Sequence, residues 1–123
     1  MNEGDIVLVV LPQADGRPKN RPAAALRKMP PFGDWLVCGI STQQRHEVAG
    51  FDDPIRTGDD DYVASGLKAP SLIRLGFLAV LPEGRLLGTI GAIASARHKR
   101  LLDRLCEHLS KNQSTDQPAQ SAR

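Results

Sequence analysis

The sequence has few aromatic residues, few cysteines and no long apolar run. Aromatic residues make up 4% of the 123 residues, which excludes a nucleic-acid platform built from several stacked rings. The two cysteines, Cys38 and Cys106, lie far apart and form no metal-type spacing, so we expect reduced thiols in a cytoplasmic protein. No apolar run approaches the roughly 20 residues of a membrane span, and residues 1–5 lack the pattern of a secretory signal. We therefore expect no membrane partner.

Short motifs that carry a known chemistry are also absent. The sequence has no phosphate-binding P-loop, no Cys-x-x-Cys pair and no His-Glu-x-x-His zinc motif. The adjacent His46 and Glu47 are expected to point apart, and the acidic residues Asp59, Asp60 and Asp61 are expected to form a solvated loop and not a cation site. The sequence thus predicts neither a metal nor a cofactor, and its net charge of +2 is too small to indicate nucleic-acid binding alone.

What the sequence does contain fits one small globular domain. Hydrophobic residues make up 41% and charged residues 24%, which is ordinary for a folded chain of this length. The 11 glycines and 9 prolines indicate many turns between short strands. Residues 111–123 are rich in Gln and Ser and lack apolar anchors, so we expect a disordered tail after a domain formed by residues 1–110.

Apolar segments separated by turn residues predict a mainly β fold. We expect strands at residues 6–11, 22–28, 36–43, 71–81 and 85–93, with the first three forming a meander and a bend at Gly76. A helix over residues 21–26 is the alternative to the second strand, but Pro30 and Pro31 leave it too short. Residues 13–20 and 44–65 are expected to be loops, the second with a short strand at residues 46–48.

A helix is predicted for residues 96–109, with Ser95 as its N-cap. Four leucines fall on one face of this helix, while its charged residues, Arg97 among them, and both histidines, His98 and His108, are expected to face solvent. The leucines are Leu101, Leu102, Leu105 and Leu109. A curved sheet followed by one helix favours a small β-barrel with a C-terminal helix, an α+β arrangement.

The stretch from Leu36 to Gln43 is the best candidate for a site. It is an apolar strand that ends in the polar residues Ser41, Thr42 and Gln43, at a rim where a rigid sheet meets a loop. A strand end can present these hydroxyl groups to a ligand. The other interpretation is that they only satisfy backbone groups.

Three segments in this order resemble the MazF/PemK family of toxins from bacterial toxin–antitoxin pairs. They are Gly4-Asp5-Ile6-Val7-Leu8-Val9, Arg21-Pro22-Ala23 and Ile40-Ser41-Thr42-Gln43. The strand, strand and helix order of residues 71–109 also matches in position. The resemblance covers nearly the whole chain except its tail.

This resemblance implies an SH3-like barrel with a C-terminal helix, and a homodimer. It also implies a metal-independent endoribonuclease that cuts single-stranded RNA such as mRNA, by attack of the ribose 2′-hydroxyl on the neighbouring phosphate. An antitoxin with an acidic segment would inhibit it. The alternative from another class is a non-catalytic SH3-like module that binds protein or nucleic acid.

The resemblance also suggests site residues. The family's arginine falls on Arg21, where a planar cation suits a phosphorane, and the family's threonine falls on Ser41, with Thr42 next to it. Because side chains alternate along a strand, only one of the two hydroxyls should face the site, and the register favours Ser41. The predicted RNA-binding residues are Arg17, Lys19, Gln43 and Lys68.

Two features depart from the family pattern. Some relatives carry an acid two residues after the basic position matched by Lys68, and this chain has Pro70 there. The acidic stretch of residues 52–61 is also unusual beside an RNA surface. We expect that stretch to lie in solvent, with competition against RNA for the basic groove as a second hypothesis.

Overall fold

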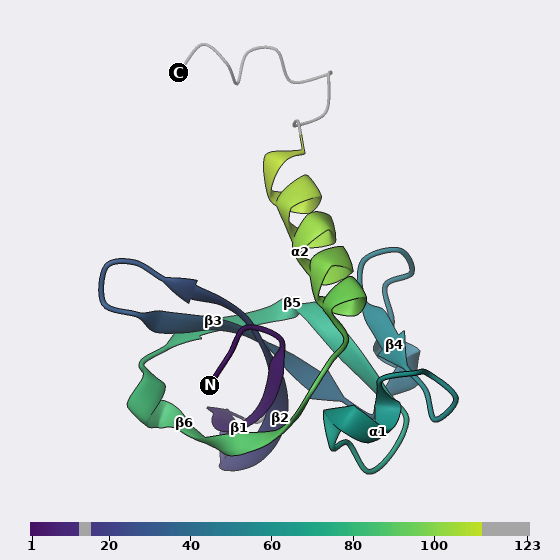
Figure 1. Cartoon of the computed structure of the whole chain (residues 1–123), viewed down its shortest axis with the longest axis horizontal. Helices are drawn as coiled ribbons and strands as arrows, with labels where there is room; N and C mark the ends of the chain where they lie inside the picture. Colours follow the sequence, from purple (N-terminus) through teal and green to yellow (C-terminus); the bar gives the residue numbers. More distant parts are fainter. Residues whose placement is uncertain (13–15, 112–123) are drawn as a thin grey trace.

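The computed structural model describes residues 1–12 and 16–111 of the chain (Figure 1). The strands are β1 (Asp5–Pro12), β2 (Pro18–Met29), β3 (Asp34–Ser41), β4 (Asp53–Ile55), β5 (Ser71–Leu81) and β6 (Leu86–Ala92). The helices are α1 (Tyr62–Ser65) and α2 (Ser95–Ser110), with single 3-10 turns η1 (Gln44–His46) and η2 (Glu83–Arg85). None of the helices in the described ranges has the length and apolarity needed to cross a bilayer.

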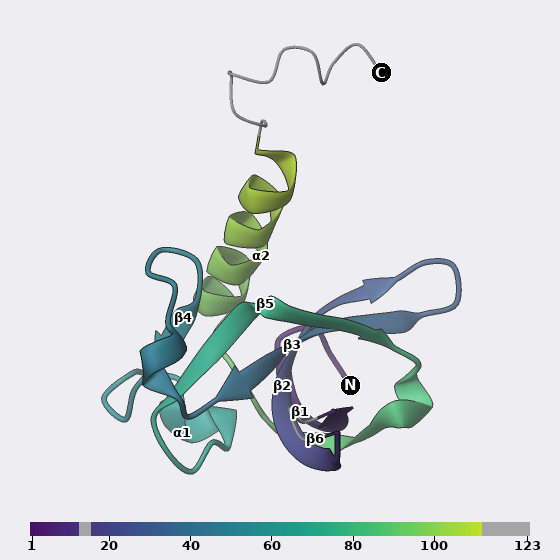
Figure 2. The same ribbon diagram turned by 180° about the vertical axis from the view of Figure 1, so that it is seen from behind.

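The described strands form one antiparallel sheet in the order β4-β5-β3-β2-β1-β6. The predicted meander of the first three strands is confirmed, because β2 pairs with β1 on one side and with β3 on the other. The sheet curls strongly without closing, since β4 and β6 end the order and do not pair with each other (Figures 1 and 2). The predicted fold class, a mainly β barrel-like sheet with a C-terminal helix, is confirmed.

The two faces of the sheet carry separate apolar clusters. One face holds Ile6, Ala24, Cys38 and Ile73, and α2 adds Leu101 and Leu105 to the same cluster. The residues next to them in sequence fill the second cluster on the opposite face: Val7, Val9, Ala23, Ala25, Trp35 and Val37. This two-sided burial explains why β1 and β3 are continuous apolar runs and not alternating ones.

The pairing of β3 with β5 is interrupted near the predicted bend at Gly76. Cys38 is opposite Leu78, but Ile40 is opposite Ile73, so several residues of β5 lie across from one residue of β3. Along β5, most successive residues before Gly76 are buried, whereas exposed and partly buried residues alternate after it. A glycine within a strand commonly marks such a place.

Some expected boundaries and local features were wrong. β2 begins at Pro18, inside the predicted 13–20 loop, whereas residues 13–15 lie outside the described part of the chain. Residues 46–48 do not form a strand, since residues 44–46 form the 3-10 turn η1. The short strand of this region is instead β4, which pairs with β5. The predicted N-cap Ser95 is instead the first residue of α2, and its neighbour Ala94 is the N-cap.

The prediction for α2 was mostly correct. Leu101 and Leu105 are buried, whereas Leu109 is 70% exposed and extends beyond the sheet with the end of the helix (Figure 1). His98 was expected in solvent, but it is partly buried and its Nε2 lies 2.8 Å from the carbonyl oxygen of Leu26. The expected disorder of the tail concerns residues 111–123, of which only Lys111 is described.

Candidate functional site

Arg21 of β2 and Ser41 of β3 lie on the same face of the sheet. The pairing of the two strands ends at Ala23 opposite Gly39, after Ala24 opposite Cys38. Because side chains alternate along a strand, Arg21 and Ser41, each two residues beyond that last pair, share its face. Arg21 pairs with Val9 of β1, whose side chain belongs to the apolar cluster on that face. Ser41 pairs with Leu72 of β5.

The three polar residues at the end of β3 differ in orientation. Ser41 is half-buried, and its Oγ accepts a hydrogen bond of 3.0 Å from the backbone N–H of Gln43, which leaves the hydroxyl proton available for donation. Thr42 and Gln43 are exposed and lie beyond the end of β3. Of the two predicted hydroxyls, Ser41 is therefore the one on the face of Arg21.

Arg74 of β5 is a third residue on this face, which the sequence interpretation did not include. Its neighbours Ile73 and Leu75 belong to the opposite cluster, and its guanidinium carbon lies 5.9 Å from the centre of the Phe77 ring. That ring covers Gly39, where a Cβ atom would lie 2.5 Å from it. Arg74 is the only charged residue within β5, and this isolated charge in an apolar strand was the available signal.

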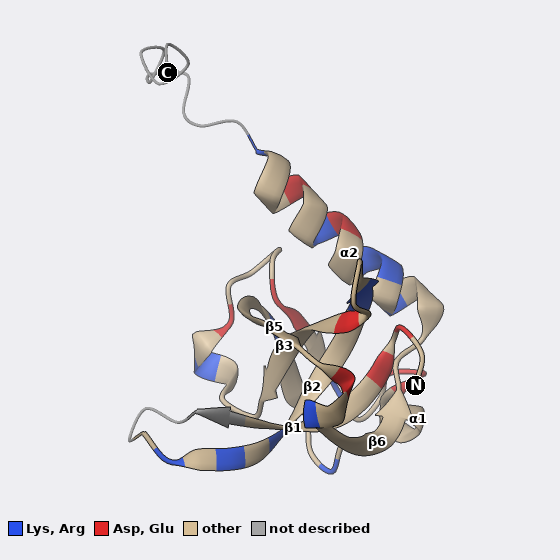
Figure 3. Cartoon of the chain, turned by 90° about the vertical axis from the view of Figure 1, so that its left-hand side faces the viewer, with Lys and Arg blue, Asp and Glu red and all other residues tan. Residues whose placement is uncertain are grey.

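The three basic residues predicted to bind RNA occupy two places. Arg17 and Lys19 are exposed and precede Arg21 at alternate positions, so the start of β2 carries a row of cations on one face, seen as repeated blue segments in Figure 3. Lys68 instead lines a cavity of about 420 Å³ together with Pro22, on the face of β2 opposite that of Arg21. The other lining residues are Leu8, Gly66, Leu67 and Ile90.

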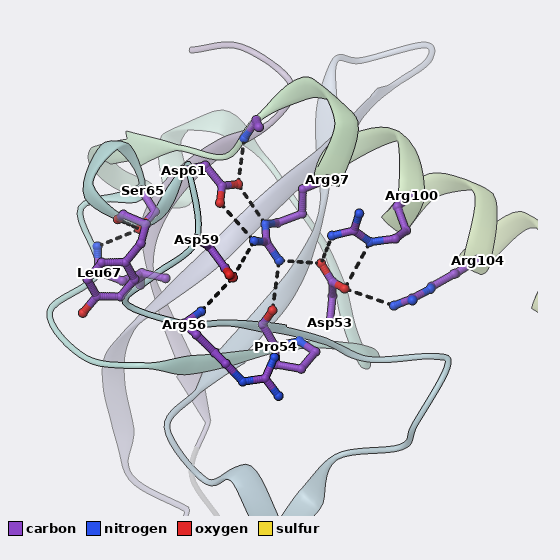
Figure 4. Close-up of polar contacts among 12 residues, drawn as sticks. Asp53, Pro54, Arg56, Asp59, Asp61, Ser65, Leu67, Arg97, Arg100 and Arg104 are labelled. Carbon is purple, nitrogen blue, oxygen red and sulfur yellow. Dashed lines mark hydrogen bonds and ion pairs between the residues drawn. The ribbon is translucent and has the colours of Figure 1, made fainter.

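The acidic stretch of residues 52–61 is largely bound to α2, which contradicts the expectation of a solvated loop (Figure 4). Arg97 donates to Asp53 at 2.7 Å, to Asp59 at 2.9 Å and to Asp61 at 2.8 Å. Arg97, expected on the polar face, is 7% exposed, and Asp53 and Asp61 are slightly more buried, at 4% and 6%. Asp53, Asp59 and Asp61 are held by Arg97 and are not available to compete with RNA for the basic groove. The hypothesis of such competition is therefore also wrong for these three residues.

Two further arginines of α2 join this network through Asp53. Arg100 Nη2 lies 2.9 Å and Arg104 Nη1 3.2 Å from its carboxylate oxygens. Asp61 in addition accepts from the backbone N–H of Ala94, the N-cap of α2, so a carboxylate from a distant loop caps the helix. The helix spacing of residues 97, 100 and 104 aligns the three arginines on one face toward the loop.

The charges of this network are mutually stabilised. Burial alone would lower the pKa of Arg97, but hydrogen bonds to Asp61, Asp53 and Asp59 outweigh burial and raise it. Hydrogen bonds from the backbone of Arg56 and from the Arg97 side chain lower the pKa of Asp59. Hydrogen bonding to Arg97 likewise lowers the pKa of Asp61, against the effect of burial. The pairing is complete, which indicates a structural role for these groups.

Neither thiol nor the acidic residues form a second reactive centre. Cys38 and Cys106 are unpaired with each other, as expected for reduced thiols, and burial raises the pKa of Cys38 to about 12. Across residues 1–12 and 16–111, no group of three or more His, Cys, Asp or Glu side chains could hold a metal ion.

Comparison with known proteins identifies the family. Residues 2–109 match the family described as PemK-like, MazF-like toxin of type II toxin-antitoxin system. The chain belongs to this family. The match includes every residue of the β2, β3 and β5 face, so Arg21, Ser41 and Arg74 all lie within the toxin domain.

A solved structure supports the fold of this PemK-like toxin. The structure of the Mycobacterium tuberculosis toxin MazF-mt6 is similar with a TM-score of 0.62 and 20% sequence identity. The alignment covers 89% of this chain and 99% of the MazF-mt6 chain. A search of curated protein sequences gives no match. The likeness to MazF-mt6 therefore concerns the fold of the whole domain.

Proposed function

We propose that this PemK-like toxin is a metal-independent, sequence-specific endoribonuclease of the cytoplasm that cuts single-stranded RNA, including mRNA. The observation that supports the proposal is that Arg21 and Ser41 are on one face of the sheet, each two residues beyond the last β2–β3 pair, Ala23 and Gly39. A phosphate group between these strands could contact a permanent cation and a hydroxyl donor at once. Membership in a toxin family favours catalysis over a purely binding module.

Each group has a distinct role in the proposed reaction. The ribose 2′-hydroxyl attacks the adjacent phosphorus, the bond to the 5′-oxygen breaks, and a 2′,3′-cyclic phosphate and a free 5′-hydroxyl result. Arg21 stabilises the added negative charge of the phosphorane, since a permanently protonated guanidinium is a poor general base. Ser41 donates to a phosphate oxygen, and Arg74 adds a second cation from β5.

The remaining basic and polar residues would guide the RNA. Lys19 precedes Arg21 in β2, and Arg17 directly precedes the strand; both would contact successive phosphates. Thr42 and Gln43 are exposed at the rim, where they could meet unpaired bases. Lys68 lies beside Pro22 on the opposite face of β2. It would contact the RNA only if the RNA chain passes around β2 to that face.

The same basic face would also bind an inhibitor. A cognate antitoxin with an acidic, initially disordered segment would compete with RNA for Arg17, Lys19 and Arg21, because both ligands carry negative charge. We further propose that the toxin acts as a homodimer.

The test uses a long RNA to map cut sites, followed by a short RNA that contains one site. We expect cleavage to continue in EDTA and to stop when the ribose at the cut site lacks its 2′-hydroxyl. The products should end in a cyclic phosphate and a 5′-hydroxyl. A strict need for Mg²⁺ would exclude this mechanism. Binding without any cleavage would favour the SH3-like binding module instead.

A further inference from the structure

A bulge in β5 brings several residues across from a single residue of β3. The pairing of the two strands is interrupted between Cys38 and Ile40, so residues 74–77 of β5 lie across from Gly39 alone. We call residues 74–77 the β5 bulge. Extra residues in one strand bend that strand and redirect its side chains, and such bulges are frequent beside functional sites. Arg74, the second cation of the candidate site, is the first residue of this bulge.

The last residue of the β5 bulge, Phe77, packs directly on Gly39. A Cβ atom at position 39 would lie 2.5 Å from the ring, which is closer than two carbon atoms can approach. Gly39 is also paired with Ala23 on its other side, so its backbone cannot easily move away from the ring. The ring packs against the apolar cluster on the face of Arg21. The absence of a side chain at Gly39 therefore allows the ring to lie on this face.

The Phe77 ring also contacts the guanidinium of Arg74. The guanidinium carbon lies 5.9 Å from the ring centre, which is within the range of a cation–π contact. Arg74 is half-buried, and across residues 1–12 and 16–111 it forms no ion pair that would hold it elsewhere. An aromatic contact involves the flat face of a guanidinium and leaves the N–H donors at its edge for an anion. The ring thus restrains Arg74 without neutralising its charge.

The backbone of the β5 bulge is supported by Asp52. Because pairing with β3 is interrupted here, the backbone N–H groups of the bulge need other acceptors. The N–H of Leu75 donates to the Asp52 carboxylate at 3.1 Å, and the N–H of Val48 donates to the same carboxylate at 2.9 Å. Asp52 is 3% exposed, and Arg104 of α2 donates to its carbonyl oxygen at 3.0 Å. The bulge is therefore fixed by specific contacts of both its backbone and its side chains.

We propose that Phe77, packed on Gly39, is a positioning residue that holds the Arg74 guanidinium in place at the candidate site. The inference rests on the proposed nuclease function and adds how its second cation is fixed. Arg21 projects from the regular pairing of β2 with β1, whereas Arg74 projects from a bulge and depends on contacts of its own. A cation that is fixed before RNA binds loses less conformational entropy at the phosphate, so the ring contact should favour the chemical step.

The experiment measures single-turnover cleavage of a short RNA by Phe77→Leu, which removes the ring but keeps an apolar side chain. We expect the maximal rate to fall about tenfold, with the RNA concentration for half-maximal rate nearly unchanged, because a displaced cation stabilises the transition state less well. Phe77→Tyr keeps the ring and should cleave at close to the native rate. Circular dichroism establishes that both variants are folded. Native-rate cleavage by Phe77→Leu would overturn the proposal.

A second measurement separates positioning of Arg74 from other effects of the ring. In the Arg74→Ala chain, Phe77→Leu should change the rate by no more than about twofold, because the group that the ring positions is already gone. A further loss of about tenfold in that background would overturn the proposal, since the ring would then act on the RNA or on the fold directly.

Tyr62→Leu is the matched control for the loss of an aromatic ring. Tyr62 is also half-buried, but it packs against the apolar cluster on the opposite face of the sheet. The variant should cleave at close to the native rate. A loss as large as that of Phe77→Leu would show that removing any half-buried ring slows cleavage, and this result would overturn the assignment of Phe77.

Nuclear magnetic resonance of the native chain tests the contact without nuclease activity, which matters if Phe77→Leu does not fold. Nuclear Overhauser effects should connect the ring protons of Phe77 with the side chain of Arg74, and Gly39→Ala should weaken them by displacing the ring. Their absence from the native chain would overturn the inference. A chain that shows them but cuts no RNA would contradict the proposed function alone.

Discussion

At the scale of single residues, the surroundings of each arginine decide what it can do. Arg97 is enclosed by three carboxylates and holds the structure together. Arg74 has no ion pair within the described part of the chain, and its guanidinium carbon lies 5.9 Å from the centre of the Phe77 ring. An arginine without a carboxylate partner keeps its charge for an anionic ligand, whereas a fully paired one does not. Burial and ion pairs therefore distinguish the structural Arg97 from Arg74.

Arg21→Ala should abolish most RNA cleavage while the fold is retained. Loss of a preorganised contact to the transition state costs on the order of 3 kcal/mol, or about a hundredfold in rate. Arg21→Lys should recover only part of this, because a lysine lacks the planar fork of donors. Single-turnover cleavage of a short RNA measures both effects.

Arg27→Ala is a suitable control for Arg21, since Arg27 lies on the same strand. The Arg27 side chain is 61% exposed and its contact with Glu3 is 3.5 Å long. The Arg27→Ala variant should cleave the short RNA at close to the native rate. Near-native cleavage by Arg21→Ala would remove Arg21 from the mechanism.

At the scale of elements, α2 acts as a clamp on the segment that contains β4. The helix contributes Leu101 and Leu105 to one core cluster and three arginines to the buried ion network. β4 in turn pairs with the start of β5, next to the segment that carries Arg74. The clamp thus fixes the edge of the sheet beside the candidate site.

Replacing Arg97 by Met should destabilise the fold by about 3–5 kcal/mol, because it leaves buried carboxylates without their cation. Lys99→Met on the same helix is the matched control. Its ion pair with Asp103 is exposed on both sides, at 76% and 65%, so we expect no measurable loss of stability. Urea unfolding monitored by circular dichroism measures both variants. Equal losses would show that the network contributes no more than a surface pair.

At the scale of the whole molecule, opposite ends of the sheet have opposite character. The β4 edge is closed by charge, and the β6 edge is open and apolar. Acid should therefore weaken the first end and spare the second. This difference predicts how the stability of the whole fold depends on pH.

The melting temperature should be nearly constant near neutral pH and should fall as the pH drops from about 5 through 3.8. The pKa values of Asp59 and Asp61 are lowered in the folded chain, so their stabilisation is complete above the unfolded value and is lost as the pH falls through the folded one. Asp59→Asn should make the acid-induced decrease smaller. Asp103→Asn should not, because Asp103 is 65% exposed. Identical acid profiles for the native chain and Asp59→Asn would contradict this assignment.

Much of the fold followed from the sequence because it depends on local pattern. Apolar β-branched runs such as Ile6 to Val10 form buried strands wherever they lie, and turn residues such as Gly33 separate them. The leucine spacing of α2 determined its buried face. The resemblance to PemK-like toxins also rested on short segments, and the family match confirmed it.

What only the tertiary structure decided are the relations between distant segments. Sequence could not show that Arg97 meets Asp53, Asp59 and Asp61, because charged residues are exposed by default and their partners lie more than 30 positions away. Nor could it show that Arg74 shares a face with Ser41, since that depends on the irregular register of β3 and β5. Side-chain type determined the five long strands and α2, but register and long-range pairing determined which residues meet, and no local pattern encodes those.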